Sequence, residues 1–240
     1  MSTSKISLRN LTDYNSINSV GSWFRRRRAV LIMELIRASK NRFNKVTILH
    51  IGGRQSYWNI FPEKFLEENN VEITLVNYSS ELTNEIDHSE QLASNRGRFK
   101  HIIADGCDMS QYDSMSYNLV HCNSVIEHVG TWERMSRLSS EIKRLAPAYY
   151  VQTPNFWFPI EPHFLTPAFH WLPEPMRIWL IQRVSLGHMS RQKNISDAVN
   201  VIESARILNS SMFFSLFKEA KHKHEWFMGL PKSLIAYKLP

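Results

Sequence analysis

The sequence has few of the residues that several classes of protein require. Only two of its 240 residues are cysteines, Cys107 and Cys122, too few for a disulfide framework or a cysteine-rich zinc site. The longest apolar run, residues 29–36, is interrupted by Glu34 and is far too short to cross a bilayer. The first ten residues contain no apolar stretch of the kind a secretory signal needs. We therefore expect a protein of a reduced, cytoplasmic compartment.

Glycine is also scarce, with eight residues, which matters wherever a loop backbone must approach a ligand closely. The remaining composition is ordinary: 43% hydrophobic and 21% charged residues exclude a largely disordered chain. The length suits one domain. A formal net charge of +7 allows an anionic partner without requiring one.

Segments rich in β-branched residues alternate with helical patterns along the chain. Strands are predicted over residues 46–51, 71–76, 101–104, 117–122 and 149–153, with a closing pair at 225–228 and 233–237. Helices are predicted from residue 22 and over 61–69, 131–145 and 211–217, with 81–96 helical or irregular and 202–208 a strand or helix edge. This alternation predicts βαβ units and a mostly parallel sheet, whose ligands lie at the carboxyl ends of the strands.

Two further segments do not fit this alternation. Residues 1–20 are polar and are expected to form a flexible N-terminal arm. Residues 154–175 are crowded with proline and aromatic residues, so they are expected to form an insertion with short helical turns.

The ends of the first and third predicted strands carry small and acidic residues. Gly52 and Gly53 follow the first strand and could bring the backbone close to a ligand, although a Gly-Gly pair is equally compatible with a plain turn. Asp105 follows the third strand, where it could accept a hydrogen bond from an exocyclic amine or simply form an Asx turn.

The end of the fourth predicted strand is richer in polar residues. Asn123 and Ser124 suit a strand end that meets a ligand. Glu127 and His128 follow and could act as acid and base. The alternative is a carboxylate favoured by a helix start, beside a surface histidine.

Taken in order, these segments resemble the class I S-adenosylmethionine-dependent methyltransferases of the small-molecule type 11 kind. The resemblance covers about residues 45–155 and rests on residues 48–53, 102–109 and, most specifically, 117–129, while residues 232–237 resemble the family's final strand. It implies an α/β, Rossmann-like, doubly wound and mostly parallel sheet with an antiparallel last strand. One domain over residues 21–240 would then hold a cofactor half at about 45–150 and an acceptor or lid insertion at about 154–200.

The resemblance also implies S-adenosylmethionine as cofactor. Its predicted binding residues are Ile51, Gly52, Gly53, Asn77, Asp105, Gly106, Cys107, Asn123 and Ser124. The two glycines of the loop would lie against the methionine and ribose parts. Asn77 would lie near the ribose hydroxyls, Asp105 would accept from the adenine amine, and Asn123 would line the methionine side.

Several positions depart from the family pattern. His50 and Asn77 each stand where the family usually has an acidic residue, and Arg54 and Ser56 stand where further glycines are common. The amide of Asn77 gives up a charge-assisted hydrogen bond, so weaker or altered cofactor binding is expected. A non-catalytic subunit that kept the fold is therefore an alternative.

Methyl transfer from a sulfonium is an in-line displacement, and a hydroxyl acceptor also needs a base. His128 and His163 are the candidate bases, and Glu127 and Glu161 could orient them or bind the acceptor. The alternative for His163 is that it caps local backbone. No metal is expected, because Ser124 stands at the first position of the Glu-x-x-Glu-His arrangement by which some relatives bind one.

The acceptor is expected to be a small hydroxylated or carboxylated molecule. Residues 151–164 resemble a subgroup found with polysaccharide and glycolipid genes, which favours a sugar or glycolipid precursor. RNA is the less favoured alternative.

The run Arg25, Arg26, Arg27 and Arg28 could contact an anionic membrane at its inner face, a phosphate-bearing substrate or RNA, or form a solvated helix face. Aromatic residues 154–180, including Trp157, Trp171 and Trp179, could form a lid, a sugar platform or a membrane-facing surface, or pack as core.

Overall fold

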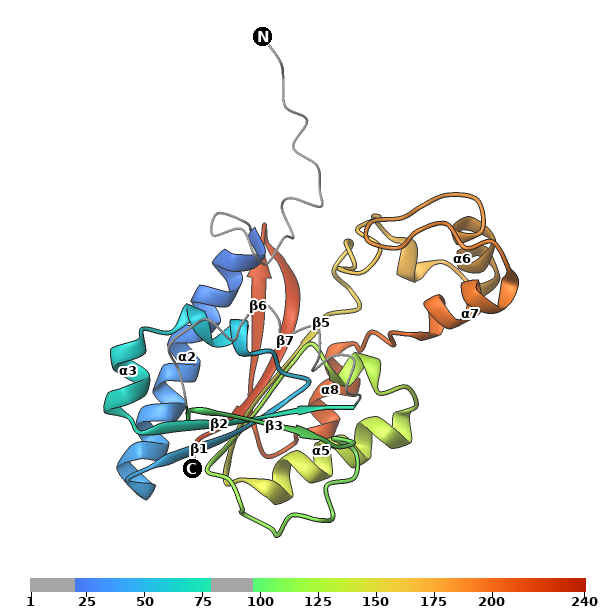
Figure 1. Ribbon diagram of the computed structural model, residues 1–240. Helices are drawn as coiled ribbons and strands as arrows, with labels where there is room; N and C mark the ends of the chain where they lie inside the picture. The colour runs from blue at the N-terminus through green and yellow to red at the C-terminus, as the bar shows by residue number, and fades with distance from the viewer. Residues whose placement is uncertain (1–19, 79–96) are drawn as a thin grey trace.

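The computed structural model describes residues 20–78 and 97–240. The predicted N-terminal arm, apart from Val20, and the segment predicted over residues 81–96 lie outside these described residues. One seven-stranded sheet organises the described chain in the order β3-β2-β1-β4-β5-β7-β6 (Figure 1). Its strands are β1 (Val46–Ile51), β2 (Val71–Asn77), β3 (Phe99–Ile103), β4 (Leu119–Asn123), β5 (Ala148–Pro154), β6 (Lys221–Phe227) and β7 (Leu230–Lys238).

The sheet is parallel from β3 to β5, and β7 runs antiparallel to both β5 and β6. This confirms the predicted Rossmann-like, mostly parallel sheet with an antiparallel last strand, the fold of class I methyltransferases. Strands β1, β4 and β5 are buried along almost their whole length, which explains why their sequences are nearly continuous apolar runs.

Helices cover both faces of the sheet. On one face lie α2 (Val20–Phe43), the 3₁₀ helix η1 (Gln55–Ile60) and α3 (Glu63–Glu68); on the other lie α5 (Trp132–Leu145) and α8 (Ser210–Leu216) (Figure 1). Each face has its own apolar core, one built around α2 and the other around α5 and α8. In the described part of the chain, no helix is long and apolar enough to span a membrane.

Local signals set several element ends. The side chain of Thr131 accepts a hydrogen bond from the backbone N–H of Arg134 and begins α5, as the predicted helix over 131–145 requires. The fourth strand begins at Leu119 rather than at residue 117, and the side chain of Asn118, just before it, accepts a hydrogen bond from the backbone N–H of Thr47. The third strand begins two residues earlier than predicted, at Phe99.

The insertion after β5 contains η3 (Phe169–Trp171), α6 (Glu174–Ile181) and α7 (Ile195–Glu203), and it projects beyond the end of the sheet (Figure 1). It has a small core of its own, made of Phe164, Phe169, Ile181, Ala198 and Ile202. The prediction of a strand or helix edge over 202–208 is largely wrong. Helix α7, capped by Asn194, ends at Glu203, and the chain then returns to the sheet, where Leu208 bridges to Asn155.

Candidate active site

The loop after β1 tolerates only glycine at its two glycine positions. A Cβ at Gly52, whose φ is +64°, would lie 2.5 Å from Cγ2 of Val125, and a Cβ at Gly53 would lie 2.4 Å from the ring of His50. The N–H of Gly52 donates to the carbonyl of Val76 at 2.7 Å, which ties the loop to the end of β2. The Gly-Gly pair is therefore packed against residues at the ends of β1, β2 and β4, which leaves no room for a Cβ at either position.

A hollow of about 170 Å³ lies beside this loop. It is lined by Arg25, Arg28, His50, Gly52, Arg54, Ser56, Tyr57, Asn123 and Ser124. Among the described residues, three arginines and no carboxylate border it, so an anionic group is the ligand that its charge favours. Three of the predicted cofactor residues, Gly52, Asn123 and Ser124, meet here.

Arg28 does not belong to the solvated helix face that was one expectation for Arg25 to Arg28. Its side chain is buried and its Nε atom lies 3.0 Å from Oε1 of Glu225. Its Nη1 donates at 2.8 Å to Oδ1 of Asn123 and to Oε1 of Gln152. Helical spacing puts Arg25 and Arg28 on the side of the sheet, while the two arginines between them are exposed. The sequence did not single out Arg28 or Gln152 as residues of the site. The i, i+3 spacing of Arg25 and Arg28 on one helix could have indicated that Arg28 faces the sheet.

Asn77 at the end of β2 is buried and supports the same loop. Its Nδ2 donates to the carbonyl of Gly53 at 3.1 Å. One donor is thus used within the protein, and its Oδ1 is the acceptor that remains for a ligand hydroxyl.

His50 replaces the acidic residue of the family pattern with a neutral group. Its Nδ1 accepts a hydrogen bond from Nε1 of Trp58 at 3.1 Å. Burial, and then the charge of Arg25, lowers the pKa of His50 to about 3. The imidazole is therefore uncharged next to the arginines that border the hollow, which avoids a further buried cation.

Asp105 forms the Asx turn that was one of its two alternatives, and its carboxylate also pairs with an arginine. Its Oδ1 accepts from the backbone N–H of Cys107 at 2.9 Å, which is an Asx turn, and both of its oxygens accept from Nη2 of Arg134 at 3.1 and 3.0 Å. Burial would raise the pKa of Asp105, but the hydrogen bonds from Cys107 and Arg134 outweigh it and lower that pKa. A Cβ at Gly106 would lie 2.8 Å from Cγ2 of Ile51, so this turn packs directly on the end of β1.

The four predicted acid–base residues lie close together between β4 and the insertion. Nε2 of His128 and Nε2 of His163 are 3.0 Å apart. Nδ1 of His163 hydrogen-bonds to Oε1 of Glu161, whose other oxygen accepts from the backbone N–H groups of His163 and Phe164 at 3.0 Å. Nδ1 of His128 donates to the carbonyl of Ser204 at 2.8 Å. Glu161, and not His163, therefore caps the local backbone. The imidazole of His163 instead links the side chains of Glu161 and His128.

Glu127 lies beside this chain without joining it directly. It is fully buried, and its Oε2 accepts from Oγ1 of Thr153 at 3.0 Å, while Oε1 has no hydrogen-bond partner among the described residues. Burial raises the pKa of Glu127. For His163, burial acts to lower the pKa, but the hydrogen bond and charge of Glu161 outweigh it and raise the pKa above 6.5. The described residues contain no group of three or more His, Cys, Asp or Glu side chains placed to hold a metal.

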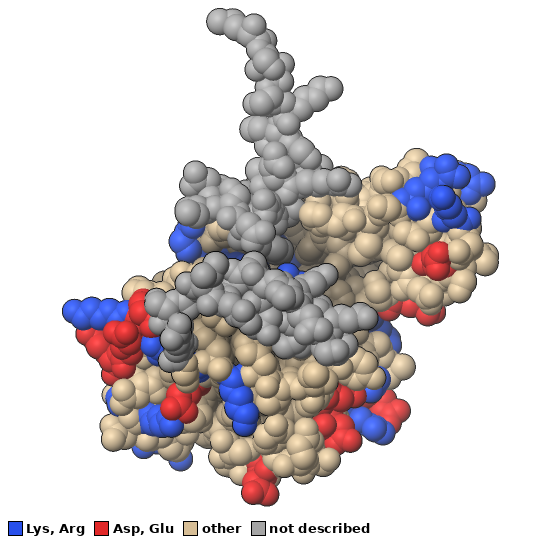
Figure 2. All heavy atoms as spheres, viewed as in Figure 1, with Lys and Arg blue, Asp and Glu red and all other residues tan. Residues whose placement is uncertain are grey.

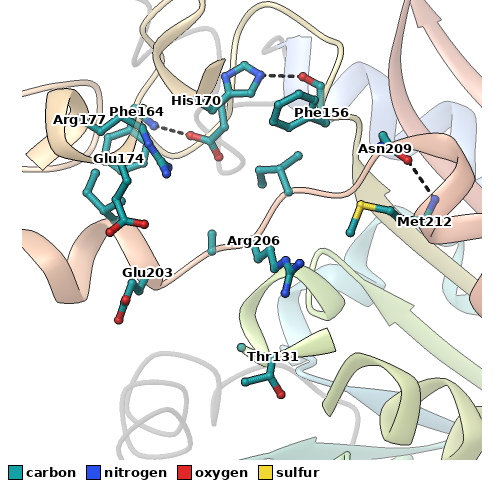
Figure 3. Close-up of a pocket in the computed structure, with 15 residues that line it drawn as sticks. Thr131, Phe156, Phe164, His170, Glu174, Arg177, Glu203, Arg206, Asn209 and Met212 are labelled. Carbon is teal, nitrogen blue, oxygen red and sulfur yellow. Dashed lines mark hydrogen bonds between the residues drawn. The ribbon is translucent and has the colours of Figure 1, made fainter. Parts of the chain in front are cut away.

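A larger cavity of about 710 Å³ opens between this cluster and the insertion (Figure 3). Phe156, Phe164 and His170 border one side of it, and Thr131 and Arg206 border another (Figure 3). Glu161 lines both this cavity and a hollow of about 30 Å³ that also touches Arg28. The acid–base cluster therefore lies between the cavity and the arginine-lined side of the site.

Comparison with solved structures supports the same fold. The PH0226 protein of Pyrococcus horikoshii superposes with a TM-score of 0.54 at 14% identity, covering 96% of this chain and 95% of that one. An O-methyltransferase family protein of Burkholderia thailandensis superposes with a TM-score of 0.50 at 11% identity, covering 89% of this chain but 57% of that one. A Rhodobacter sphaeroides protein described as a Zn-dependent alcohol dehydrogenase gives 0.53 at 10% identity, with 80% and 83% covered.

No protein-family model and no curated protein sequence matches the chain. At these identities the structural likeness shows the fold alone. The strand order, with β7 antiparallel between β5 and β6, makes this a protein of the Rossmann-like methyltransferase fold.

Proposed function

We propose that the protein is an S-adenosylmethionine-dependent methyltransferase that acts on a small hydroxylated or carboxylated acceptor. The observation that carries the proposal is the loop at the end of β1, where two glycines have no room for a Cβ and the first of them, Gly52, borders an arginine-lined hollow. In a sheet of this kind, the carboxyl ends of the strands are where a nucleoside cofactor binds.

The described residues fit this cofactor at both of its ends. Arg25 and Arg28 border the hollow in which the cofactor's carboxylate would lie. Oδ1 of Asn77 offers an acceptor to a ribose hydroxyl, and Asp105 offers its carboxylate to the adenine amine. Bound there, the cofactor would supply an electrophilic methyl group on its sulfonium.

The chain's own residues would align the acceptor and take its proton. A hydroxyl acceptor that reaches from the large cavity past Glu161 to the two histidines would lose its proton to Nε2 of one of them, His128 or His163, once the proton that the two atoms share has left. Glu161 holds His163 in place and stabilises its charged form. The aromatic walls of the cavity, Phe156 and Phe164, suit the flat apolar side of a sugar ring, which supports a sugar or glycolipid precursor as acceptor.

A non-catalytic methyltransferase-fold subunit is a second candidate, and one observation favours it. Both oxygens of the Asp105 carboxylate already accept from Nη2 of Arg134. A cofactor amine would have to compete with that guanidinium. The same binding experiment separates the two candidates.

Calorimetric titration with S-adenosylmethionine and with S-adenosylhomocysteine tests the proposal. We expect both to bind, and Asp105→Asn to weaken them about tenfold, because a hydrogen bond to a charged group contributes about 1.5 kcal/mol or more. Asp113→Asn, which removes an exposed carboxylate outside the site, is the matched control and should leave binding unchanged.

Arg134→Gln distinguishes a lost ion pair from a lost ligand. It breaks the same pair with Asp105 but leaves the carboxylate, so it should keep or raise the affinity for the cofactor. Absence of heat at millimolar cofactor, with Asp105→Asn no different from the unaltered protein, would favour the non-catalytic subunit instead.

A further inference from the structure

The insertion exposes large apolar side chains along one side of α6 and its neighbours. Met176 and Trp179 are 51% and 53% exposed, and their i, i+3 spacing puts them on one face of the helix. Trp171 before the helix and Val184 after it are 42% and 46% exposed. Such a group of exposed apolar side chains on a small subdomain marks an interaction surface rather than scattered surface residues. We name these four residues the α6 face.

The segment from the middle of α6 onward carries cations and no acidic residue. Residues 178–196 contain Arg183, Arg191 and Lys193 and no aspartate or glutamate, whereas Glu174 and Arg177 line the cavity on the other side of the helix. The guanidinium of Arg183 lies 4.1 Å from the centre of the Trp179 ring. Figure 2 shows Lys and Arg side chains gathered at the outer end of the insertion.

Backbone contacts hold these cations at the end of α6. Nε of Arg191 donates to the carbonyl of Gln182 at 2.9 Å. The N–H of Gln192 donates to the carbonyl of Ile181 at 2.9 Å, which fixes Lys193 beside the same helix end. The positive charge therefore belongs to the same surface as the exposed tryptophan.

We propose that the α6 face docks onto the surface of an anionic membrane. The exposed tryptophan and methionine side chains would enter the boundary between the lipid headgroups and the acyl chains. The arginine and lysine side chains would contact lipid phosphates. The opposite side of α6 points inward, since Glu174 and Arg177 line the large cavity and Ile181 is in the insertion core. One helix would then separate the lipid surface from the cavity. Resting on the proposed function, this favours an acceptor carried on a lipid anchor.

The α6 face includes two of the tryptophans, Trp171 and Trp179, for which the sequence allowed a membrane-facing surface, and it lies apart from the run Arg25 to Arg28, the other candidate for membrane contact. Of the four residues Arg25 to Arg28, Arg28 is buried against Glu225 and cannot reach a headgroup. Arg26 and Arg27 are exposed and provide a matched control, because they carry the same two charges on another part of the molecule.

Co-sedimentation of the full chain with vesicles tests the proposal. One set of vesicles is phosphatidylcholine alone, and the other is equal parts phosphatidylcholine and phosphatidylglycerol. We expect binding to the anionic vesicles only, with release at high salt. Arg183→Gln with Lys193→Gln should weaken that binding about thirtyfold, since each cation near an anionic surface contributes about fivefold. Arg26→Gln with Arg27→Gln should change it much less.

A second pair of variants tests the apolar part. Trp179→Ala should weaken vesicle binding about tenfold through lost apolar burial. Trp226→Ala removes a tryptophan of similar exposure from β6 and should have no effect. Circular dichroism melting of each variant shows whether the fold is kept.

Four outcomes would overturn the proposal. They are equal binding to both kinds of vesicle, equal effects of the two charge variants, and binding of a single-stranded RNA that Trp179→Ala abolishes while vesicles are ignored. The fourth is a dimer in sedimentation that Trp179→Ala converts to monomer, which would make the α6 face an interface between copies. None of these readouts depends on methyl transfer, so docking and the proposed function can fail separately.

Discussion

The Nε2 atoms of His128 and His163 lie 3.0 Å apart, the distance of a hydrogen bond in which one nitrogen donates a proton and the other accepts it. The Nδ1 atoms of both rings are already committed, one to the carbonyl of Ser204 and the other to the carboxylate of Glu161. The pair therefore holds one proton between its Nε2 atoms and carries one positive charge. It becomes a base when that proton leaves.

The imidazole of His163 should titrate above its usual range. We expect nitrogen-15 spectra of this ring to show its transition above pH 6.5, because the hydrogen bond and charge of Glu161 raise the pKa of His163. Glu161→Gln should lower that transition. A transition of His163 at or below pH 6.5 in the unaltered protein would contradict this role of Glu161.

The contact between Glu161 and His163 should make stability depend on pH in a defined window. The pKa of His163 is raised, so its contribution is complete below pH 6.5 and is lost as pH rises through the folded-state pKa. The pKa of Glu161 is lowered, since hydrogen bonds from His163 and Phe164 outweigh burial, so its contribution is complete above pH 4.5 and is lost as pH falls further. The pair should stabilise most between pH 4.5 and 6.5.

Urea unfolding of the unaltered protein and of Glu161→Gln across this range measures the effect. The difference in unfolding free energy should be largest inside the window and should shrink on both sides of it. A difference that does not change with pH would show that the glutamate acts only through its backbone hydrogen bonds.

Arg28 should contribute strongly to the unfolding free energy, although the two arginines before it in the sequence are exposed. Arg28→Met leaves the buried carboxylate of Glu225 without its closest partner, because Lys232 is 3.8 Å away. We expect a loss of about 3–5 kcal/mol in unfolding free energy. Arg27→Met, which removes only an exposed contact with Trp23, should cost about 1 kcal/mol or less.

Substitution of Arg28 should also weaken binding of the cofactor of the proposed function. Arg28 fixes the side-chain oxygens of Asn123 and Gln152, so its loss frees both amides to turn. Calorimetry of Arg28→Lys, which keeps the charge but not the fork of donors, should show weaker cofactor binding. Unchanged affinity would remove Arg28 from the site while leaving its structural role intact.

The contact between Gly53 and His50 should be visible as a coupling energy. Gly53→Ala places a Cβ 2.4 Å from the imidazole, so we expect overpacking to cost about 1–3 kcal/mol. In a His50→Ala background the same substitution should cost much less, because the ring is gone. Additive effects in urea unfolding of the double variant would show that the loop yields elsewhere.

The sequence by itself determined the fold and the edge of the sheet where the chemistry lies. Continuous β-branched runs such as Val46–Ile51 form buried parallel strands, and parallel strands bring their carboxyl ends to one edge. Residues at the carboxyl ends of separate strands, such as Gly52 and Asn123, therefore had to lie close together. These are consequences of local pattern and of chain direction, both of which can be read from one sequence.

Only the tertiary structure decided which side chains contact one another at that edge of the sheet. Arg28 reaches Gln152 because the rotation of α2 against the sheet turns it inward, and helix rotation depends on packing. Arg134 pairs with Asp105 across 29 residues, and the insertion returns so that Ser204 accepts from His128 across 76. Contacts between segments so far apart in the chain depend on how the layers and the insertion pack together, and no local pattern carries that information.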